Sequence, residues 1–345
     1  MKKLNKSWLY GLILLVVLVF FEVRYGNVFL SAGKGEAIKI EGGTMGTSYH
    51  ITYFDEEGRN FQSEIDSIFK DFNQSLSTYI PDSEISTFNK TAIFKFELPY
   101  FLPMLEKSKE IYELSHGAYD PTVGALVNAW GFGPEGRQTP DALVVDSLLS
   151  IVGFDSIYYD SIAVCKLKAN IQLDFSAIAK GYGADVISQF LLSKGIEDHF
   201  VEIGGEIMCH GRNQQNKEWR VGINVPSPDA EMQSAAAIIS LTDRGIATSG
   251  NYRNYYIKDG RKYAHTISPV TGAPVEHSLL SATVVAPDCA TADAVATALM
   301  VMGLEAGKKM LESREDLEAY LIYSDEQGKM RMFVTEGLSD QVKSL

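Results

Sequence analysis

Two side chains four positions apart, Asp293 and Thr297, could together bind a divalent metal ion. They lie in the stretch 290–300, whose other residues are Ala, Val, Leu, Met and one further Thr, and this composition predicts a helix that is buried on all sides. The spacing places both side chains on one face of that helix, one turn apart. A buried carboxylate is costly unless it is paired or bound to a metal, and carboxylate and hydroxyl oxygens suit a hard cation such as Mg²⁺. The spacing alone still favours an internal hydrogen bond of Thr297 and an ion pair of Asp293 with a basic neighbour.

A second candidate site is predicted where a strand runs into a helix, over residues 171–185. Ser176 would cap that helix, and the amides at such a start can receive an anion with the help of Lys180, one turn further on. Gly181 and Gly183 each cost about 1 kcal/mol relative to Ala inside a helix. Close approach of another backbone or of a ligand would explain them, and so would tight packing with Lys180 in solvent.

Several single features are weak by themselves. His265 precedes a Pro/Gly turn and has the side chain best suited to general base catalysis near neutral pH, although a lone histidine usually packs or faces solvent. Asp120, followed by Pro, predicts a helix cap. Gly204 and Gly205 indicate a bulge or a close contact within a strand. Tyr79 could be an exposed aromatic platform or a simple loop residue. The usual motifs of dinucleotide, P-loop, zinc-protease and serine-hydrolase sites are absent.

The composition limits the class of protein. The chain of 345 residues is 46% hydrophobic and carries a formal net charge of −13, so a sizeable core is expected. A nucleic-acid partner is not expected, since non-specific binding needs a basic surface. The three cysteines, at 165, 209 and 289, give neither a disulfide framework nor a metal motif, and at most one bridge could form.

The N-terminus predicts export. Lys2, Lys3 and Lys6 precede an apolar run over residues 8–21, which is typical of a signal peptide or an uncleaved signal anchor and is shorter than the roughly 20 residues of a full membrane span. Residues 1–36 are therefore predicted to be a signal or membrane anchor with a short tether. The body is expected on the periplasmic side of the bacterial inner membrane, anchored or secreted.

Residues 37–345 are predicted to form a single large α+β domain of mixed, mostly antiparallel sheets with packed helices, because the strands cluster with antiparallel-looking turns and do not alternate strictly with helices. Helices are expected at 61–76, 98–114, from Asp120, from Thr139, and at 177–193, 290–302 and 304–312. Strands are expected at 47–54, 156–160, 162–168, 170–175, 199–204, 218–225, 236–242, 253–258, 262–266, 280–286, 319–324 and 330–334.

Eight segments in this order resemble the ApbE-type FAD:protein FMN transferases, a family of flavin transferases. They include Thr-Met-Gly-Thr at 44–47, the segment 117–124 together with Trp-Gly-Phe-Gly at 130–133, and Glu-Ile-Gly-Gly-Glu at 202–206; the others lie at 76–79, 174–185, 248–253, 265–272 and 292–299. The resemblance implies an ApbE, T-fold-like architecture and Mg²⁺-dependent transfer of FMN from FAD to a Ser or Thr hydroxyl of a target protein, with release of AMP.

The family pattern also implies site residues and partners. FAD would contact Met45, Tyr79, Ala118, Tyr119, Asp120, Asp174, Lys180 and Ile267. Mg²⁺ would be bound by Asp293, Thr297 and the carbonyl of Ala177, and His265 is the candidate base. The family's acceptors carry Ser/Thr-Gly-Ala-Ser/Thr, which this chain lacks, so the acceptor is expected to be another chain, a flavoprotein subunit of a membrane redox complex.

The sequence departs from the family pattern at two places, and two alternative functions stay open. Ser268 stands where Asp is expected in His-x-x-Asp-Pro, and Ser176-Ala177 stands where glycines are common. The first alternative is a FAD pyrophosphatase, in which water replaces the protein hydroxyl and FMN and AMP are released. The second is a non-catalytic flavin-binding protein.

Overall fold

The computed structural model describes residues 34, 36–133, 140–226, 235–251, 255–258 and 261–344. The expected signal or anchor segment therefore lies outside the described residues, except for Lys34 and Glu36. Within the described part of the chain, no helix has the length and apolar character needed to cross a membrane.

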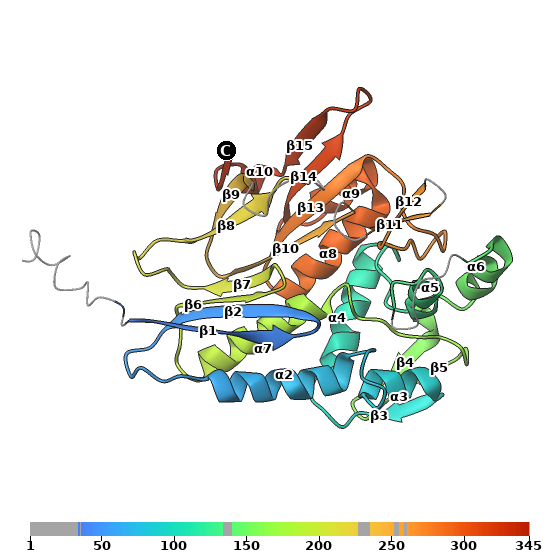
Figure 1. Cartoon of the computed structure of the whole chain (residues 1–345), viewed down its shortest axis with the longest axis horizontal. Coiled ribbons are helices and arrows are strands. Elements are labelled where there is room, and N and C mark those ends of the chain that lie inside the picture. Colours follow the sequence, from blue (N-terminus) through green and yellow to red (C-terminus); the bar gives the residue numbers. More distant parts are fainter. Residues whose placement is uncertain are drawn as a thin grey trace, which may run out of the picture.

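An eight-stranded sheet forms the centre of the molecule, with strand order β1-β2-β6-β7-β10-β13-β14-β15 (Figure 1). Every neighbouring pair in it is antiparallel, so the predicted α+β class with mostly antiparallel sheets is confirmed. The strands are β1 (Ala37–Thr44), β2 (Thr47–Phe54), β6 (His199–Ile203), β7 (Glu206–His210), β10 (Arg244–Gly250), β13 (Leu279–Ala286), β14 (Glu318–Ser324) and β15 (Met330–Val334).

Alternation along these strands directs apolar side chains to both faces of the sheet. Helices cover one face, and a three-stranded sheet of order β16-β9-β8 covers the other (Figure 1). On β14, for example, Ala319 and Leu321 belong to the helix-side core, whereas Tyr320 and Ile322 belong to the core beneath the small sheet. The helices are α2 (Gln62–Leu76), α4 (Phe101–Leu114), α7 (Ala179–Ser193), α8 (Cys289–Met302) and α9 (Leu304–Glu312), and the small sheet contains β8 (Trp219–Asn224), β9 (Ala235–Leu241) and β16 (Val342–Ser344).

Shorter elements complete the fold around this frame. A second three-stranded sheet has the order β3-β5-β4, and β11 pairs with β12. These elements are α3 (Glu84–Lys90), β3 (Ile93–Lys95), α5 (Gly124–Ala129), α6 (Ala142–Leu149), η1 (Phe154–Ser156), β4 (Ile157–Tyr159), β5 (Ala163–Lys166), β11 (Tyr255–Lys258), β12 (Arg261–Ala264) and α10 (Glu336–Ser339).

Segment 170–175 is not a strand, although its apolar alternation predicted one. The side chain of Asn89 takes the place of a neighbouring strand, since its Oδ1 accepts from the Leu173 amide at 2.8 Å and its Nδ2 donates to the Leu173 carbonyl at 2.9 Å. The only ladder contact within this described segment is a parallel bridge between Gln172 and Val123. A side chain thus satisfies backbone groups that the sequence pattern assigned to a sheet.

Three predicted helix starts were wrong. Asp120 does not cap α5, which begins four residues later. Ser176 does not cap α7, which starts after Ile178 without a side-chain cap. For α6 the cap is Asp141, which accepts from the Val144 amide at 2.9 Å, whereas Thr139 lies outside the described residues. Asp120 and Ser176 both take part in turns that precede their helices.

Candidate functional site

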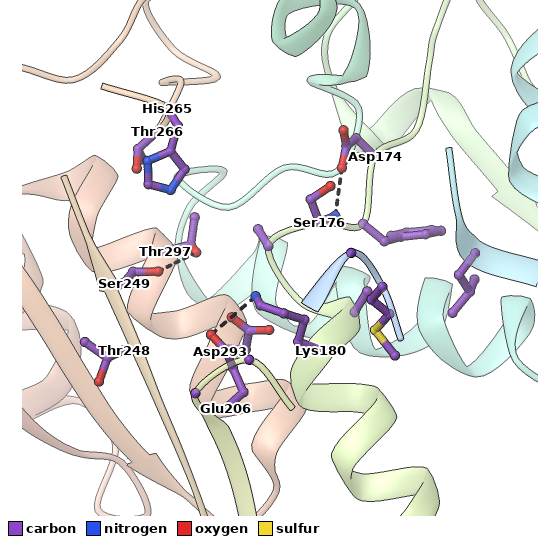
Figure 2. A pocket seen from close by; sticks show the side chains of 18 of the residues that line it. Asp174, Ser176, Lys180, Glu206, Thr248, Ser249, His265, Thr266, Asp293 and Thr297 are labelled. Atoms are coloured by element: carbon purple, nitrogen blue, oxygen red, sulfur yellow. Dashed lines mark hydrogen bonds and ion pairs between the residues drawn. The ribbon is translucent and has the colours of Figure 1, made fainter. Parts of the chain in front are cut away.

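A pocket of about 1700 Å³ brings all twelve predicted site residues together. It opens where the N-terminal half of α7, the middle of α8, the turn between β6 and β7 and several loops meet (Figure 2). Its lining includes Met45, Tyr79, Ala118, Tyr119, Asp120, Asp174, Ala177, Lys180, His265, Ile267, Asp293 and Thr297. The structure therefore places these residues at one site, and their individual roles remain predictions.

Two buried carboxylates and one ammonium group lie together in this pocket, and we refer to Lys180, Glu206 and Asp293 as the charge cluster (Figure 2). Lys180 Nζ lies 3.3 Å from Glu206 Oε1, and the amide of Gly181 donates to Asp293 Oδ2 at 3.1 Å. Only 5% of Glu206 and 3% of Asp293 is exposed. Glu206 Oε2 is buried and has no hydrogen-bond partner among the described residues.

The environment of the charge cluster favours one additional cation. Burial raises the pKa of both the Glu206 and the Asp293 carboxyl, against the opposing effect of Lys180, and Asp293 raises the pKa of Glu206 further. Burial alone would lower the pKa of Lys180, but the two carboxylates outweigh it, so that this pKa is raised. Two carboxylates therefore share one ammonium group, and a metal ion would compensate the excess negative charge.

The proposed metal donors fit that need. Asp293 and Thr297 lie one turn apart on α8, and both side chains reach the pocket (Figure 2). Ala177 lines the same pocket. Thr297 Oγ1 lies 3.0 Å from Ser249 Oγ, so one hydroxyl fixes the other and a lone pair remains for a ligand. Within the described residues no group of three His, Cys, Asp or Glu side chains is arranged to hold a metal, so an ion here would depend on one carboxylate, one hydroxyl and one carbonyl.

Several of the predicted flavin contacts are fixed by internal hydrogen bonds. Tyr119 is buried, and its hydroxyl lies 3.0 Å from Ser108 Oγ. Asp120 accepts hydrogen bonds from the amide and hydroxyl of Thr122, at 2.8 and 2.6 Å, and from the Phe154 amide at 3.3 Å. Burial raises the pKa of Asp120 to about 6. Tyr79, by contrast, is 65% exposed, which suits a platform for a flat ring.

His265 lines the pocket, but Ser268, three residues further on, does not. The ring of His265 packs edge-on against the ring of Phe132, with 6.4 Å between centroids. Ser268 is buried outside the lining, and its Oγ accepts from the amides of Val270 and Thr271, each at 3.2 Å. The serine found in place of the expected aspartate thus stabilises the turn, as a short Asp side chain also can.

The paired glycines form the turn between β6 and β7 and are not a bulge within a strand. Gly204 and Gly205 have φ values of +63° and +107°, which favour glycine. A Cβ on Gly204 would lie 2.8 Å from Thr47 Cγ2 and 3.2 Å from Lys180 Cδ. The turn therefore lets Lys180 lie directly against the backbone while Glu206 follows on β7.

Comparisons with known proteins agree with this arrangement. The ApbE family model matches residues 45–321, which is most of the chain. The chain belongs to the ApbE family. One relative is the FAD:protein FMN transferase of Vibrio cholerae serotype O1; it is 39% identical, and the match covers 88% of this chain and 94% of the relative. Another is the FAD:protein FMN transferase of Haemophilus influenzae; it is 36% identical, and the match covers 88% of this chain and 90% of the relative.

Solved structures of ApbE proteins share the fold. The flavin transferase ApbE from Vibrio cholerae superposes with a TM-score of 0.80 at 36% identity, covering 89% of this chain and 99% of that one. The flavinyl transferase ApbE from Pseudomonas stutzeri, in its apo form, gives a TM-score of 0.79 at 32% identity, with 89% and 96% covered.

In this ApbE protein, sequence reasoning missed one residue of the charge cluster. Glu206 ends the Glu-Ile-Gly-Gly-Glu segment, but no role was predicted for it. Its position directly after Gly204 and Gly205 is the only sequence signal, because such a turn brings the next side chain close to the neighbouring elements. The deciding information is tertiary, namely the packing of β7 against both α7 and α8.

Proposed function

We propose that this chain is a Mg²⁺-dependent FAD:protein FMN transferase that attaches FMN through its phosphate to a Ser or Thr hydroxyl of an acceptor protein and releases AMP. The observation that carries the proposal is the charge cluster, with more carboxylate than ammonium, at the centre of a pocket large enough for a dinucleotide. The names of the relatives support the same activity.

Five residues of the pocket are assigned to ligand binding in this proposal. Asp293, Thr297 and the Ala177 carbonyl would hold Mg²⁺, whose charge would offset that of the pyrophosphate and of the leaving AMP. Lys180 would orient the phosphate oxygens, and Tyr79 would pack on the flavin ring.

The reaction is a displacement at the phosphorus of the FMN phosphate. The acceptor hydroxyl oxygen forms a bond to this phosphorus, the bond to the bridging oxygen breaks, and AMP leaves with that oxygen. His265 would receive the proton of the attacking hydroxyl. This assignment is supported by one observation, that His265 and the charge cluster line the same pocket.

The test incubates the full chain with FAD, MgCl₂ and an acceptor protein that carries Ser/Thr-Gly-Ala-Ser/Thr. The acceptor should gain one FMN by mass spectrometry, with AMP in equal amount, and EDTA should stop both. Asp293→Ala should abolish turnover and leave quenching of FAD fluorescence mostly intact, whereas the surface change Asp340→Ala should leave both unaltered.

The other outcomes identify the alternatives. AMP release without labelling of the acceptor would make the chain a FAD pyrophosphatase. FAD binding without any AMP release would make it a non-catalytic flavin-binding protein. Either result rejects the transferase.

We also propose that the enzyme acts on the periplasmic side of the inner membrane, on a flavoprotein subunit of a membrane redox complex. The basic and apolar residues of the first 21 positions support export. Fusion of a reporter that is active only in the periplasm to the C-terminus tests this. An inactive reporter on a fusion protein that is expressed would contradict the proposal.

A further inference from the structure

The pocket continues beyond the predicted flavin contacts along one strand of the small sheet. Its lining includes five consecutive residues of β8, namely Arg220, Val221, Gly222, Ile223 and Asn224. Successive side chains of a strand point to opposite faces of the sheet. A run of five neighbours therefore borders one pocket along the edge of the strand and not on one of its faces.

This edge of β8 is open in the described part of the chain. The strand pairs with β9 on one side and is the last strand of the small sheet. No backbone hydrogen bond among the described residues joins its other side to a further element. Alternate N–H and C=O groups of an antiparallel edge strand point away from its partner, so β8 presents them to the pocket. Gly222 is exposed at the centre of the strand and lets another backbone approach closely.

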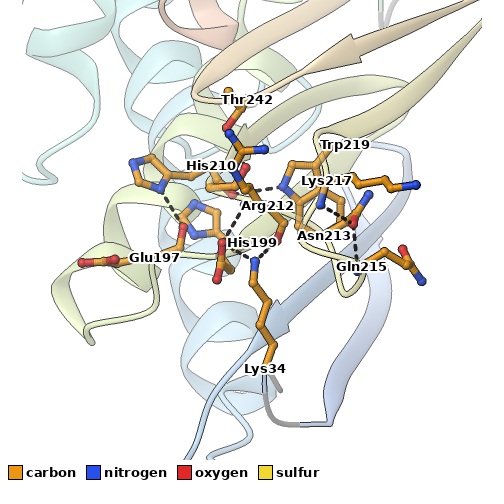
Figure 3. A network of polar contacts seen from close by, with 12 residues as sticks. Lys34, Glu197, His199, His210, Arg212, Asn213, Gln215, Lys217, Trp219 and Thr242 are labelled. Atoms are coloured by element: carbon orange, nitrogen blue, oxygen red, sulfur yellow. Dashed lines mark hydrogen bonds and ion pairs between the residues drawn. The ribbon is translucent and has the colours of Figure 1, made fainter. Parts of the chain in front are cut away.

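Polar contacts fix the beginning of β8 (Figure 3). Trp219 Nε1 donates to the His210 carbonyl at 3.0 Å, and Asn213 Nδ2 donates to the Glu218 carbonyl at 2.8 Å. Thr242 Oγ1 donates to the Gly211 carbonyl at 2.6 Å. The connection from β7 to β8 is thereby tied at both ends, and the open edge is formed before any partner binds.

The charge along this edge indicates what kind of segment it would accept. Arg220 is exposed and makes no ion pair or hydrogen bond with the described residues. Glu202, which also lines the pocket, is already engaged by His50 Nδ1 at 2.6 Å and by the Gly205 amide at 2.8 Å. A guanidinium that no described residue pairs with, on a chain of net charge −13, suits a carboxylate, which it can bind through two hydrogen bonds.

Two glycines line the pocket that contains both this edge and the charge cluster. Gly204 and Gly205 are exposed, and a Cβ on Gly204 would lie 3.2 Å from Lys180 Cδ. An extended segment on β8 could therefore pass over the turn and reach the reactive end of the pocket.

We infer that the acceptor protein binds by adding an extended segment to the open edge of β8, with an acidic side chain against Arg220, and that this pairing delivers its Ser or Thr hydroxyl across Gly204 and Gly205. The inference rests on the proposed function and identifies the acceptor surface for it. Backbone hydrogen bonds of this kind give affinity, and the side-chain contact gives selectivity.

The first test reverses a charge at each edge of the small sheet. Arg220→Glu should raise the KM for the acceptor about tenfold or more through loss of a charge-assisted contact, with the Kd for FAD unchanged. The matched control is Lys343→Glu, an exposed change on β16 at the opposite edge of the same sheet, which should leave both values unaltered. An unchanged KM in Arg220→Glu overturns the inference, and so does an equal loss of FAD affinity, which would assign Arg220 to the FAD site.

The second test needs no turnover. Amide hydrogen exchange is measured without FAD, in the presence of two synthetic peptides that contain Ser-Gly-Ala-Thr and differ only in an Asp or Asn beside it. The Asp peptide should slow exchange at alternate residues of β8, but not on β16, and the Asn peptide should do so more weakly. Equal exchange on β8 with and without peptide rejects the docking mode. Failure of the wild-type chain to label any acceptor, with β8 protected, rejects the proposed function instead.

Discussion

At the scale of single residues, Glu206 has the least compensated charge in the pocket. One of its oxygens pairs with Lys180, while the other is buried and has no partner in the part of the chain that the structure describes, and Asp293 presents a second carboxylate to the same ammonium group. Buried charges of this kind are unfavourable unless each is compensated. The cluster is therefore arranged for a ligand that brings positive charge, and Glu206 helps to retain it without being one of its predicted donors.

Glu206→Gln tests this role. The amide keeps the shape of the side chain but removes one negative charge, so the Mg²⁺ concentration that gives half-maximal AMP release should rise about tenfold, equivalent to about 1.4 kcal/mol. The control is Glu202→Gln on the other strand of the same hairpin, whose carboxylate is already bound by His50 and Gly205. A half-saturating Mg²⁺ concentration that is the same in both variants would contradict the role.

His199 predicts a pH dependence of stability. Its ring is fully buried, with Nε2 2.7 Å from Ser188 Oγ and Nδ1 3.0 Å from the Ile196 carbonyl. Burial lowers its pKa from 6.5 to about 4. The unfolded chain therefore binds this proton at a higher pH than the folded chain, and the free energy of unfolding falls as the pH drops from about 6.5 towards 4. The loss between pH 7 and pH 5 should be about 2 kcal/mol.

Urea unfolding at both pH values measures this loss. His199→Asn removes the titrating ring, so its stability should depend less on pH than that of the wild type, by about the same 2 kcal/mol. The matched variant His116→Asn changes an exposed histidine at φ +51°, a conformation that Asn tolerates, and should keep the wild-type dependence. Identical pH dependences in all three proteins would rule out His199 as the source.

At the scale of elements, strongly periodic segments were predictable and glycine-containing or polar strands were not. β2 matches its predicted bounds, and α2, α8 and α9 lie within a residue of theirs. β1 was not predicted, and it contains Gly42 and Gly43, a residue type that is unfavourable inside strands. In the sheet, however, Gly42 pairs with Tyr49, and a Cβ there would lie 2.6 Å from the Tyr49 hydroxyl. The glycine makes room for a ring on the neighbouring strand, which no local pattern reveals.

No strand was predicted at β10, whose C-terminal half is polar. It nevertheless pairs with β13 there, and the hydroxyls of Thr248 and Ser249 contact Thr283 and Thr297. These residues are polar because they line the pocket, so local pattern and fold disagree at the site itself. Residue type and spacing made candidates of Asp293, Thr297, Lys180, His265 and Tyr79, whereas the site roles of the other seven residues were implied only by the family resemblance. Glu206 and the true start of α7 depend on packing between distant segments.

The crossing of α7 and α8 gives a prediction about two neighbouring glycines. A Cβ on Gly181 would lie 2.3 Å from the Cys289 carbonyl oxygen and 2.9 Å from Asp293 Cβ, so the helices would have to separate. A Cβ on Gly183 would meet mainly Met45 Cε, at 2.6 Å, and the end of a Met side chain can move. Gly181→Ala should therefore lower the free energy of unfolding by about 1–3 kcal/mol.

Gly183→Ala is the matched control on the same helix. Its gain in helix propensity of about 1 kcal/mol should offset much of the cost, so that its urea midpoint stays near that of the wild type. Gly181→Ala should also slow AMP release, since it displaces Asp293. Equal urea midpoints for the two variants would show that the helix crossing is not the constraint.

At the scale of the whole molecule, two cores share one sheet. Cys289 belongs to a core on the helix side, and Cys209 belongs to the core beneath the small sheet. Both lie on elements that contact the central strands, Cys209 on β7 and Cys289 at the start of α8. Because the eight-stranded sheet contributes side chains to both cores, neither core can lose its packing without exposing the other face of the same strands.

The cysteines report whether the two cores unfold together. All three are free, with Cys165 partly exposed and the other two buried. Burial raises the pKa of Cys209 to about 12 and that of Cys289 well above its ordinary value, so neither thiol should react while the chain is folded. In a urea series with a thiol reagent and mass spectrometry, Cys165 should react first, and Cys209 and Cys289 should become labelled together at the main transition. Cys165→Ser should remove only the early label.

Labelling of Cys209 at lower urea than Cys289 would mean that the small sheet opens by itself. Because β8 belongs to that sheet, its open edge would then lack the rigidity that strand addition by an acceptor needs.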